Sequence, residues 1–412
     1  MKQLFNVFLI GSFLFLFAVP VQAKTAPWWD FQSVDTMKYS RDLSNELLDS
    51  PDSLLKMTDE QVKSIANTGA THVAIATPYD SKFLPVLKAW VAAARKYHLN
   101  VWFRGNWSGW EKWFDFPSIS REEHLRKTVQ FIKDNPSLFE NGDYFSACPE
   151  CENGGPGDPR RNGDVEGHRK FLIDEYNAQL KAFRDINKNV QINLNSMNGD
   201  VARLVMDKAT TKALGGQVVV DHYVAKPETL NEDITAFAEQ SGGRVLLGEF
   251  GAPIGDINGK MTEVEQAEWL KQTLSLLVEN PNLYGLSYWT NMGGSTALWH
   301  EDGSPKKGVE VLQSFYTPAT VVGKLTNPLD QPLSGTIQLG ERKLQVEKGE
   351  YELPYLDENA VVKVSSSGYE SQSYSISELL QHTTIELTPN HQSWWYRLQA
   401  WAHALSKRFF SP

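Results

Sequence analysis

Residues 217–251 read QVVVDHYVAKPETLNEDITAFAEQSGGRVLLGEFG, a short apolar run, a helical segment and a second apolar run. The runs Gln217–Val220 and Val245–Gly248 are rich in Val and Leu, as strands buried on both faces of a parallel sheet are. Between them, Leu230–Gln240 has apolar residues at the three- and four-residue spacing of a helix. This stretch therefore predicts two parallel strands joined by a helix.

The same alternation extends over residues 31–316. Further predicted strands are Gln32–Met37, His72–Thr77, Val101–Gly105, Tyr144–Cys148, Val190–Asn195 and Leu283–Trp289. Further predicted helices are Asp59–Asn67, Phe83–Tyr97, Arg121–Asn135, Gly167–Asn187, Thr262–Glu279 and Gly308–Phe315. Eight strands, each followed by a helical segment, predict an α/β chain with a (β/α)8 TIM barrel. An open doubly wound sheet would place a Gly-rich phosphate turn after its first strand, and the DTMK sequence of residues 35–38 has no glycine.

The N-terminus has the pattern of a signal peptide. Lys2 precedes an apolar stretch from Leu4 to Val19, and Val21-Gln22-Ala23 then supplies a small-residue cleavage site. We expect cleavage after Ala23 and export of the chain to a periplasm or beyond. The alternative, an uncleaved membrane anchor, is disfavoured because the apolar stretch is shorter than the roughly 20 residues that a span requires.

Two further parts follow the barrel, which we assign to residues 24–316. Residues 317–389 lose the helical period, and their short runs predict a small all-β sandwich with strands at Thr320–Leu325, Gly335–Leu339, Lys343–Val346, Ala360–Ser365 and Thr383–Leu387. Residues 390–412 form a Trp-rich amphipathic tail, with apolar residues at Trp394, Leu398, Trp401, Leu405 and Phe409 and no acidic residue. Such a helix either packs on the folded chain or makes a peripheral membrane contact.

The composition limits which classes of binding partner are expected. The chain has 40 Lys and Arg against 50 Asp and Glu, a net charge of −10. Nucleic acid is excluded as an expected partner because phosphate contacts require a basic surface. Thirteen Trp residues are many for one chain, and several fall in predicted loops.

Catalytic side chains of a barrel stand at the carboxyl ends of its strands. The seventh strand ends in Glu249, within GEFG. The fourth ends in CPECENGG, where Glu150 and Glu152 have the same strand parity; Glu150 is closer to the strand and Glu152 is the alternative. Two carboxylates facing each other across a barrel mouth are what glycoside hydrolysis requires, one as acid and one as nucleophile or base.

These residues resemble the clan A glycoside hydrolases, and family 5, the cellulase and mannanase family, is the nearest group. The resemblance covers roughly residues 30–316 and includes DHY at residues 221–223 and Tyr288-Trp289 at the ends of strands six and eight. It implies a retaining mechanism on a β-linked glycan, with Glu150 as acid/base and Glu249 as nucleophile. It also implies supporting roles for four residues that would contact the nucleophile or the sugar: Arg104, His222, Tyr223 and Trp289.

Two positions depart from that family. Pro149 stands where the family usually has an Asn before the acid/base, and Arg104 ends strand three, whereas the family's Arg is usually on a neighbouring strand. These departures keep open a non-catalytic glycan-binding protein on a degenerate barrel, or a structural envelope protein. The sandwich resembles the carboxypeptidase-regulatory-like (transthyretin-like) modules at VGK 322–324, PLSG 332–335, GEY 349–351 and Gly368-Tyr369.

Aromatic loop residues support a sugar ligand independently. Trp107, Trp110 and Trp113 follow strand three and Trp299 follows strand eight, and an aromatic face packs well on the apolar face of a pyranose. The alternative for each is a place in the core. Asn195, at the end of strand five, is a candidate for a hydroxyl contact.

Cys148 and Cys151 are the only cysteines and could form a disulfide that shapes the loop carrying Glu150. A redox motif would open a helix of a thioredoxin-like unit, and zinc would require further ligands at a suitable spacing. The glycines and Asp158 that follow lack calcium-loop spacing, since prolines and arginines interrupt them. We therefore predict no metal and no cofactor.

Overall fold

The computed structural model describes residues 27–107, 114–192, 195–391 and 394–410. The predicted signal peptide and the loop residues Trp110 and Trp113 lie outside these ranges.

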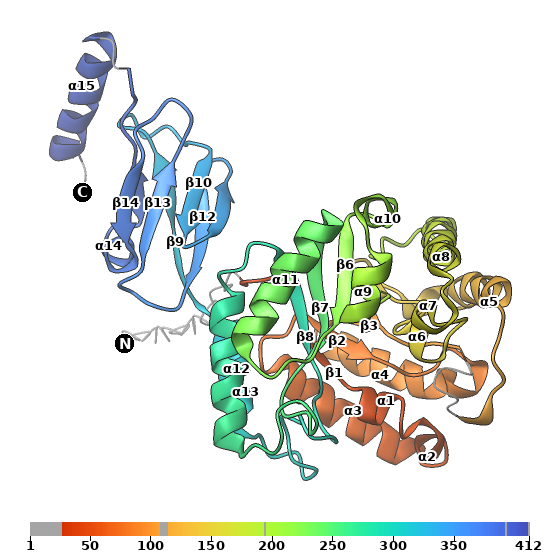
Figure 1. The fold of residues 1–412 in the computed structure, drawn as a ribbon. Helices are drawn as coiled ribbons and strands as arrows, with labels where there is room; N and C mark the ends of the chain where they lie inside the picture. The colour runs from red at the N-terminus through yellow and green to blue at the C-terminus, as the bar shows by residue number, and fades with distance from the viewer. Residues whose placement is uncertain (1–26, 108–113, 193–194, 392–393, 411–412) are drawn as a thin grey trace, which may run out of the picture.

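The first part of the chain is a TIM-type barrel of eight parallel strands in the order β4-β3-β2-β1-β8-β7-β6-β5 (Figure 1). β1 pairs with both β2 and β8, so the first and last strands are neighbours. An isolated parallel bridge joins Tyr144 of β4 to Gln191, six residues before β5. The strands are β1 (Phe31–Asp35), β2 (His72–Ile75), β3 (Asn100–Phe103), β4 (Tyr144–Phe145), β5 (Met197–Asn198), β6 (Gln217–Asp221), β7 (Arg244–Phe250) and β8 (Leu283–Tyr288).

Helices follow the strands and surround the sheet. The main ones are α3 (Pro51–Ala66), α4 (Leu84–Lys96), α5 (Arg121–Asp134), α8 (Val165–Asp185), α11 (Pro227–Ser241), α12 (Glu263–Leu277) and α13 (Lys307–Tyr316). Short helices lie in the loops: α1 (Met37–Ser40), α2 (Ser44–Leu48), α6 (Cys151–Gly154), α7 (Pro159–Asn162), α9 (Gly199–Val205) and α10 (Lys208–Ala213). The sequence did not predict α9 and α10, because helices of six or seven residues carry too few turns for a periodic signal.

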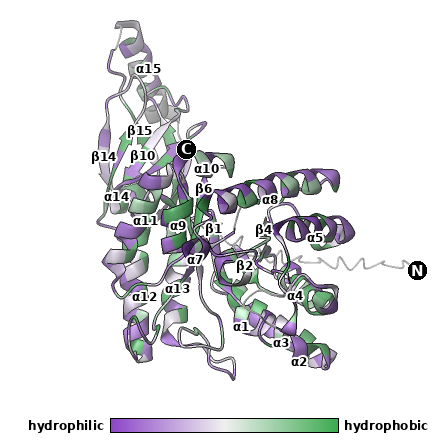
Figure 2. Ribbon diagram, turned by 45° about the vertical axis from the view of Figure 1, so that its right-hand side comes forward, coloured by the Kyte–Doolittle hydropathy of each residue, from purple (hydrophilic) through white to green (hydrophobic). Residues whose placement is uncertain are grey.

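Local sequence sets several helix boundaries. Pro stands in the first turn of α3, α4 and α11, where its missing N–H costs no hydrogen bond. Thr262 begins α12 with a capping box, in which its side chain and that of Glu265 each accept a hydrogen bond from the other residue's backbone N–H. Helices α8 and α12 alternate hydrophilic and hydrophobic residues along their length (Figure 2), as helices packed on a sheet do.

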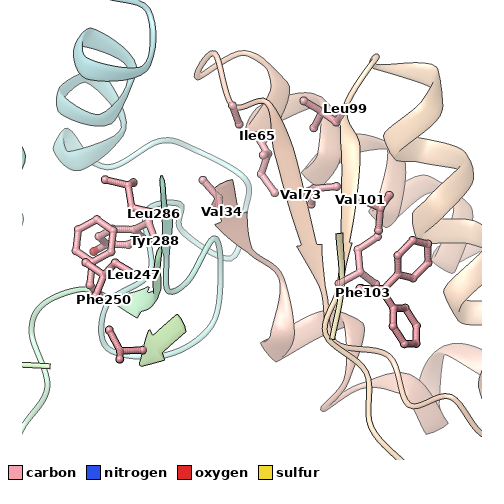
Figure 3. Packing of buried hydrophobic residues seen from close by; sticks show 14 of the residues in the cluster. Val34, Ile65, Val73, Leu99, Val101, Phe103, Leu247, Phe250, Leu286 and Tyr288 are labelled. Atoms are coloured by element: carbon pink, nitrogen blue, oxygen red, sulfur yellow. The ribbon is translucent and has the colours of Figure 1, made fainter. Parts of the chain in front are cut away.

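The strands are buried on both faces. On the outer face, Leu247 and Phe250 of β7 lie close to Leu286 and Tyr288 of β8 (Figure 3). Inside the barrel, a layer of six buried residues comes from six strands: Phe31, Ala74, Trp102, Val219, Leu246 and Tyr284. This layer fills the lower interior, so polar groups at the strand ends rest on a packed floor.

The β-sandwich follows α13. A four-stranded sheet has the order β11-β10-β13-β14 and a three-stranded sheet the order β12-β9-β15. Its elements are β9 (Ala319–Thr326), β10 (Gly335–Leu339), β11 (Arg342–Val346), β12 (Glu350–Tyr355), β13 (Val361–Ser365), β14 (Gln372–Ser375), α14 (Ile376–Gln381) and β15 (Thr384–Glu386). Both sheets share one apolar core that includes Leu325, Ile337 and Val364. The final helix is α15 (Trp394–Phe410).

The sandwich contacts the amino-terminal end of the barrel. Arg342 of β11 donates a hydrogen bond to the carbonyl of Val278 at 2.9 Å, and another to the carbonyl of Trp28. Val278 and Trp28 precede β8 and β1 respectively. The carboxyl ends of the barrel strands therefore lie on the side away from the sandwich.

Candidate active site

Arg104 is the centre of a buried polar cluster at the carboxyl ends of the strands. It directly follows β3, has no exposed surface, and its guanidinium lies 4.6 Å from the ring centroid of Trp102 in the interior layer. Its Nη1 donates to Asp35 Oδ2 at 2.6 Å and lies 2.7 Å from Glu249 Oε1. Its Nη2 lies 3.1 Å from Asp221 Oδ2 and also donates to Ser196 at 3.0 Å. One guanidinium thus joins carboxylates from β1, β6 and β7.

Glu249 is the carboxylate that these contacts present at the barrel mouth. The pairing of β6 with β7 shifts register between Val220 and Asp221, so that Asp221 lies opposite Glu249. Glu249 is 6% exposed, and its Oε2 accepts a hydrogen bond from the Tyr223 hydroxyl at 2.7 Å. Arg104 on one oxygen and Tyr223 on the other fix the orientation of this carboxylate.

The cluster contains three carboxyl groups and one guanidinium, and the pKa values of two of the carboxyl groups are raised. Burial raises the pKa of Asp35 to about 6, even though Arg104 opposes the rise; the charge of Glu249 adds to it. Burial, followed by the charge of Glu249, raises the pKa of Asp221 well above its ordinary value. Asp35 and Asp221 therefore retain protons to higher pH than isolated aspartates do.

The loop after β4 carries the other predicted carboxylates. Glu150 is partly exposed, and its charge raises the pKa of Asp221 and of Tyr223 after the larger effects of burial and Glu249. Glu152 is 6% exposed, and its Oε1 accepts hydrogen bonds from the backbone and side-chain nitrogens of Asn198 at 2.7 and 3.2 Å. Burial raises the pKa of Glu152. Glu150 therefore acts electrostatically on the residues around Glu249, whereas Glu152 is bound to the start of α9.

Asn195 and a disulfide hold this loop in place. Asn195 Oδ1 accepts hydrogen bonds at 3.1 Å from the Ser146 hydroxyl and from the backbone N–H groups of Ala147 and Cys148. Cys148 and Cys151 form a disulfide on either side of Glu150. Asn195 thus positions the chain, and its oxygen is occupied by protein donors.

His124 of α5 lies beside the disulfide. The spacing of residues in the sequence did not reveal this proximity. Its ligand atoms and those of Cys148 and Cys151 lie within 4.8 Å of one another. With both sulfurs bonded to each other, the cysteines are not thiolate ligands. The ring of His124 contacts Glu175 at 2.6 Å and Asn106 at 3.2 Å, so this cluster is a hydrogen-bonded support behind the loop.

Trp289 and Tyr223 form the aromatic edge of the site. Their ring centroids are 6.0 Å apart in an edge-to-face arrangement, and Lys38 lies 5.5 Å from the Trp289 ring centroid. His222 points elsewhere: its ring contacts Asp233 of α11 at 2.7 Å and packs edge-on against Phe237. The structure therefore brings Tyr223 to Glu249 and turns His222 toward the outer helix.

Two predicted sugar platforms are buried away from this cluster. Trp107 is 8% exposed, donates to Thr128 at 3.1 Å, and packs against Tyr79 and Phe131. Trp299 is 5% exposed and lines a cavity of about 470 Å³ between α3 and the loop after β8. Both side chains are buried, as the core alternative from the sequence expects, and Trp299 also borders this cavity.

Sequence reasoning did not place Asp35, Asp221 and Ser196 in the site. Asp35 ends β1 and Asp221 ends β6, so acidic residues at the carboxyl ends of barrel strands were the available signal. Ser196 had no such signal, because the predicted fifth strand covered Val190–Asn195 whereas β5 is Met197–Asn198.

Comparison with known proteins establishes the fold. No family model and no curated protein matches the sequence. Among solved structures, a family 5, subfamily 18 glycoside hydrolase from Streptomyces cattleya has a TM-score of 0.50 at 15% identity over 73% of this chain and 84% of that one. The corresponding Bifidobacterium longum enzyme has a TM-score of 0.50 at 13% identity over 72% and 81%. Both were solved as glutamate-to-alanine variants in complex with Manβ1-4GlcNAc.

Longer enzymes also match. β-Glucuronidase 2 from Bacteroides uniformis has a TM-score of 0.46 at 10% identity over 81% of this chain, which spans only 44% of that protein. The barrel of the present chain is similar in fold to glycoside hydrolases of clan A.

Proposed function

We propose that this chain is a retaining glycoside hydrolase that cleaves a β-linkage in a poly- or oligosaccharide. The observation that supports this most is the fixed carboxylate of Glu249 at the end of β7, held by Arg104 and Tyr223 at 2.7 Å each. The ion pair with Arg104 on one oxygen and the hydrogen bond from Tyr223 on the other fix the orientation that a nucleophilic carboxylate requires.

In the proposed first step, Glu249 attacks the anomeric carbon while Glu150 protonates the departing glycosidic oxygen. The C–O bond to the leaving sugar breaks as the glycosyl ester to Glu249 forms. In the second step Glu150, now ionised, removes a proton from water, and the water oxygen displaces Glu249. Two inversions give net retention at the anomeric carbon.

Glu150 is preferred over Glu152 as acid/base on two grounds. The charge of Glu150 acts on Asp221 and Tyr223, both of which lie beside Glu249. Glu152 has one carboxylate oxygen occupied by Asn198 and is nearly enclosed. The raised pKa of Glu152 is compatible with an acid, so the variant series must include it.

The proposed substrate is a β-linked glycan. Trp289 offers an aromatic surface beside Glu249 through its contact with Tyr223, and the two family 5 structures bind a β-1,4-linked disaccharide. A sugar ring stacked on Trp289 would direct its anomeric carbon toward the carboxylate.

The test is hydrolysis of β-glucans, mannans, xylans and exopolysaccharides by the wild type beside Glu150→Gln, Glu152→Gln and Glu249→Gln. We expect the Glu150 and Glu249 variants to lose turnover and Glu152→Gln to keep it. Loss in Glu152→Gln with retention in Glu150→Gln would reverse the acid/base assignment. The anomeric configuration of the first product, followed by NMR, must be that of the substrate.

A non-catalytic glycan-binding protein is the second candidate, favoured by Pro149 where family 5 usually has Asn. It predicts tight binding to one glycan and no turnover of any. A catalyst instead loses turnover and keeps glycan binding on Glu249→Ala.

Export belongs to the same proposal. A disulfide between Cys148 and Cys151 suits an oxidising compartment, as the predicted signal peptide does. We place the chain in a periplasm or outside the cell, with residues 317–389 as an accessory module of the carboxypeptidase-regulatory-like type and residues 390–412 as a peripheral contact to the envelope.

A further inference from the structure

Helix α15 has two opposite faces with different surroundings. Tyr396, Ala400 and His403 share one side, at four- and three-residue spacing, and are partly buried. Trp394, Leu398 and Trp401 have the same spacing two residues earlier, which is about 200° around the helix axis. The two sets therefore lie on opposite sides of the helix.

The polar side contacts the sandwich. His403 Nε2 lies 2.8 Å from Asp330 Oδ2, in the loop after β9. Burial, followed by the charges of Tyr369 and Glu386 on the sandwich, raises the pKa of Tyr396. The helix thus contacts the sandwich through Tyr396 and His403, as the docking alternative from the sequence expects, and these contacts come from the side opposite its apolar face.

The apolar side is exposed to a degree found nowhere else among the described tryptophans. Trp394, Trp395 and Trp401 are 64%, 58% and 62% exposed, and Leu398 is 45% exposed. Seven of the other eight described tryptophans are less than 9% exposed, and Trp289 is partly buried in the candidate active site. The described part of the chain otherwise encloses its indoles but presents three of them on one helix, which marks an interaction surface.

The charge of the tail identifies the partner. Residues 390–412 contain Arg397, Lys407 and Arg408 and no acidic residue, while the remaining residues contain 37 of the 40 basic residues and all 50 acidic ones. An anionic surface therefore attracts this helix and repels the rest of the chain. Trp side chains favour the interface between lipid headgroups and acyl chains.

We infer that α15 lies flat on an anionic phospholipid bilayer, with Trp394, Leu398 and Trp401 in the headgroup region. Among the described residues, no helix has both the length and the apolarity needed to cross a membrane. α15, at 17 residues or about 25 Å, has the amphipathic pattern of an interfacial helix.

A glycan is a less suitable occupant of this face. Sugar sites combine an aromatic surface with polar groups that fix the hydroxyls. On this face Leu398 lies between Trp394 and Trp401, and Leu405 follows one turn later. The rings of Trp394 and Trp395 also stack on each other, with centroids 4.1 Å apart, so each covers one face of the other.

The bilayer contact sets the orientation of the enzyme. α15 lies at the end of the sandwich remote from the barrel (Figures 1 and 2), and the sandwich contacts the amino-terminal end of the barrel strands. The candidate active site, at the opposite end of those strands, would face away from the membrane. The helix would hold the site above the bilayer, open to a glycan on its other side.

The experiment is co-sedimentation of the chain, purified without the predicted leader, with vesicles of phosphatidylethanolamine and phosphatidylglycerol, and with vesicles of phosphatidylcholine alone. We expect binding to the anionic vesicles, weakened by added salt, with a blue shift of Trp emission. Trp394→Gln combined with Trp401→Gln should reduce the affinity roughly tenfold or more. Combined Gln substitutions at Arg397, Lys407 and Arg408 should reduce it on anionic vesicles only, by roughly fivefold for each residue removed.

Exposed apolar residues elsewhere provide the matched control. Leu55 and Val361 are 58% and 61% exposed, and Ser at both positions should leave vesicle binding unchanged. Equal binding by the Trp variant, or no binding of the wild type to either vesicle, overturns the inference. The inference is also overturned if the wild type does not bind vesicles but forms a dimer or a glycan complex that the Trp variant fails to form. Hydrolysis of a soluble glycan should be the same in the wild type and the Trp variant, so failure of this inference and failure of the proposed activity are separate results.

Discussion

Replacing Arg104 with Met removes the guanidinium that contacts Asp35, Asp221 and Glu249 and leaves three buried carboxyl groups near one another. Breaking a buried ion pair by removing one partner costs about 3–5 kcal/mol of unfolding free energy, because the remaining charge has no compensation. Met fills much of the volume of the Arg stem, so the loss measures charge more than packing.

The expected loss depends on pH. A carboxyl group whose pKa is raised in the folded state stabilises the fold below its unfolded pKa, and this contribution disappears as the pH rises through the folded pKa. The pKa of Asp35 is about 6 while Arg104 opposes the rise, and removing Arg104 moves it higher. The variant should therefore be most destabilised above about pH 7 and should recover as the pH falls toward about 5, where the carboxyl groups take up protons.

The assay is urea unfolding of the wild type and Arg104→Met at about pH 8 and about pH 5. Asp35→Asn added to Arg104→Met is the matched control, since it removes one uncompensated charge and keeps the oxygen that accepts a hydrogen bond from the Met37 N–H at 2.6 Å. The double variant should be more stable than Arg104→Met at the higher pH. Wild-type stability of Arg104→Met at both pH values would refute the charge balance described here.

Three further changes test other parts of the site. Tyr223→Phe removes a 2.7 Å hydrogen bond to Glu249; we expect kcat/KM to fall roughly 10- to 100-fold, and an unchanged kcat/KM would contradict the role given to the hydroxyl. Ser at both Cys148 and Cys151 opens a very short loop, so urea unfolding should show a loss of about 2 kcal/mol together with lower turnover; full activity would mean that the disulfide does not shape the Glu150 loop. Asn195→Ala leaves three donors at 3.1 Å without their acceptor and should cost about 1–3 kcal/mol, lowering kcat more than glycan affinity, which isothermal calorimetry and kinetics would separate.

Local pattern was enough for the barrel and for one carboxylate. Apolar runs and helical periods are properties of neighbouring residues, so most predicted strands and main helices agree with the structure within a few residues. The exceptions are the fifth strand, which lies at Met197–Asn198 and outside its predicted range, and α3, which begins at Pro51, eight residues before the predicted start. Glu249 was identifiable because it ends a continuous apolar strand. The five sandwich strands that the sequence predicted are present, while β12, β14 and α14 lacked a recognisable pattern.

The tertiary structure alone decided which polar groups meet. Asp35, Arg104, Asp221 and Glu249 come from four strands, and only barrel closure and the register shift in β6 bring them onto one guanidinium. From the sequence, the adjacent residues His222 and Tyr223 are equally good candidates for the site. In the structure their side chains point in different directions, so His222 contacts Asp233 of α11 and Tyr223 contacts Glu249. The physical reason is that burial and strand pairing are encoded over a few residues, whereas electrostatic contacts depend on distances between segments far apart in the chain.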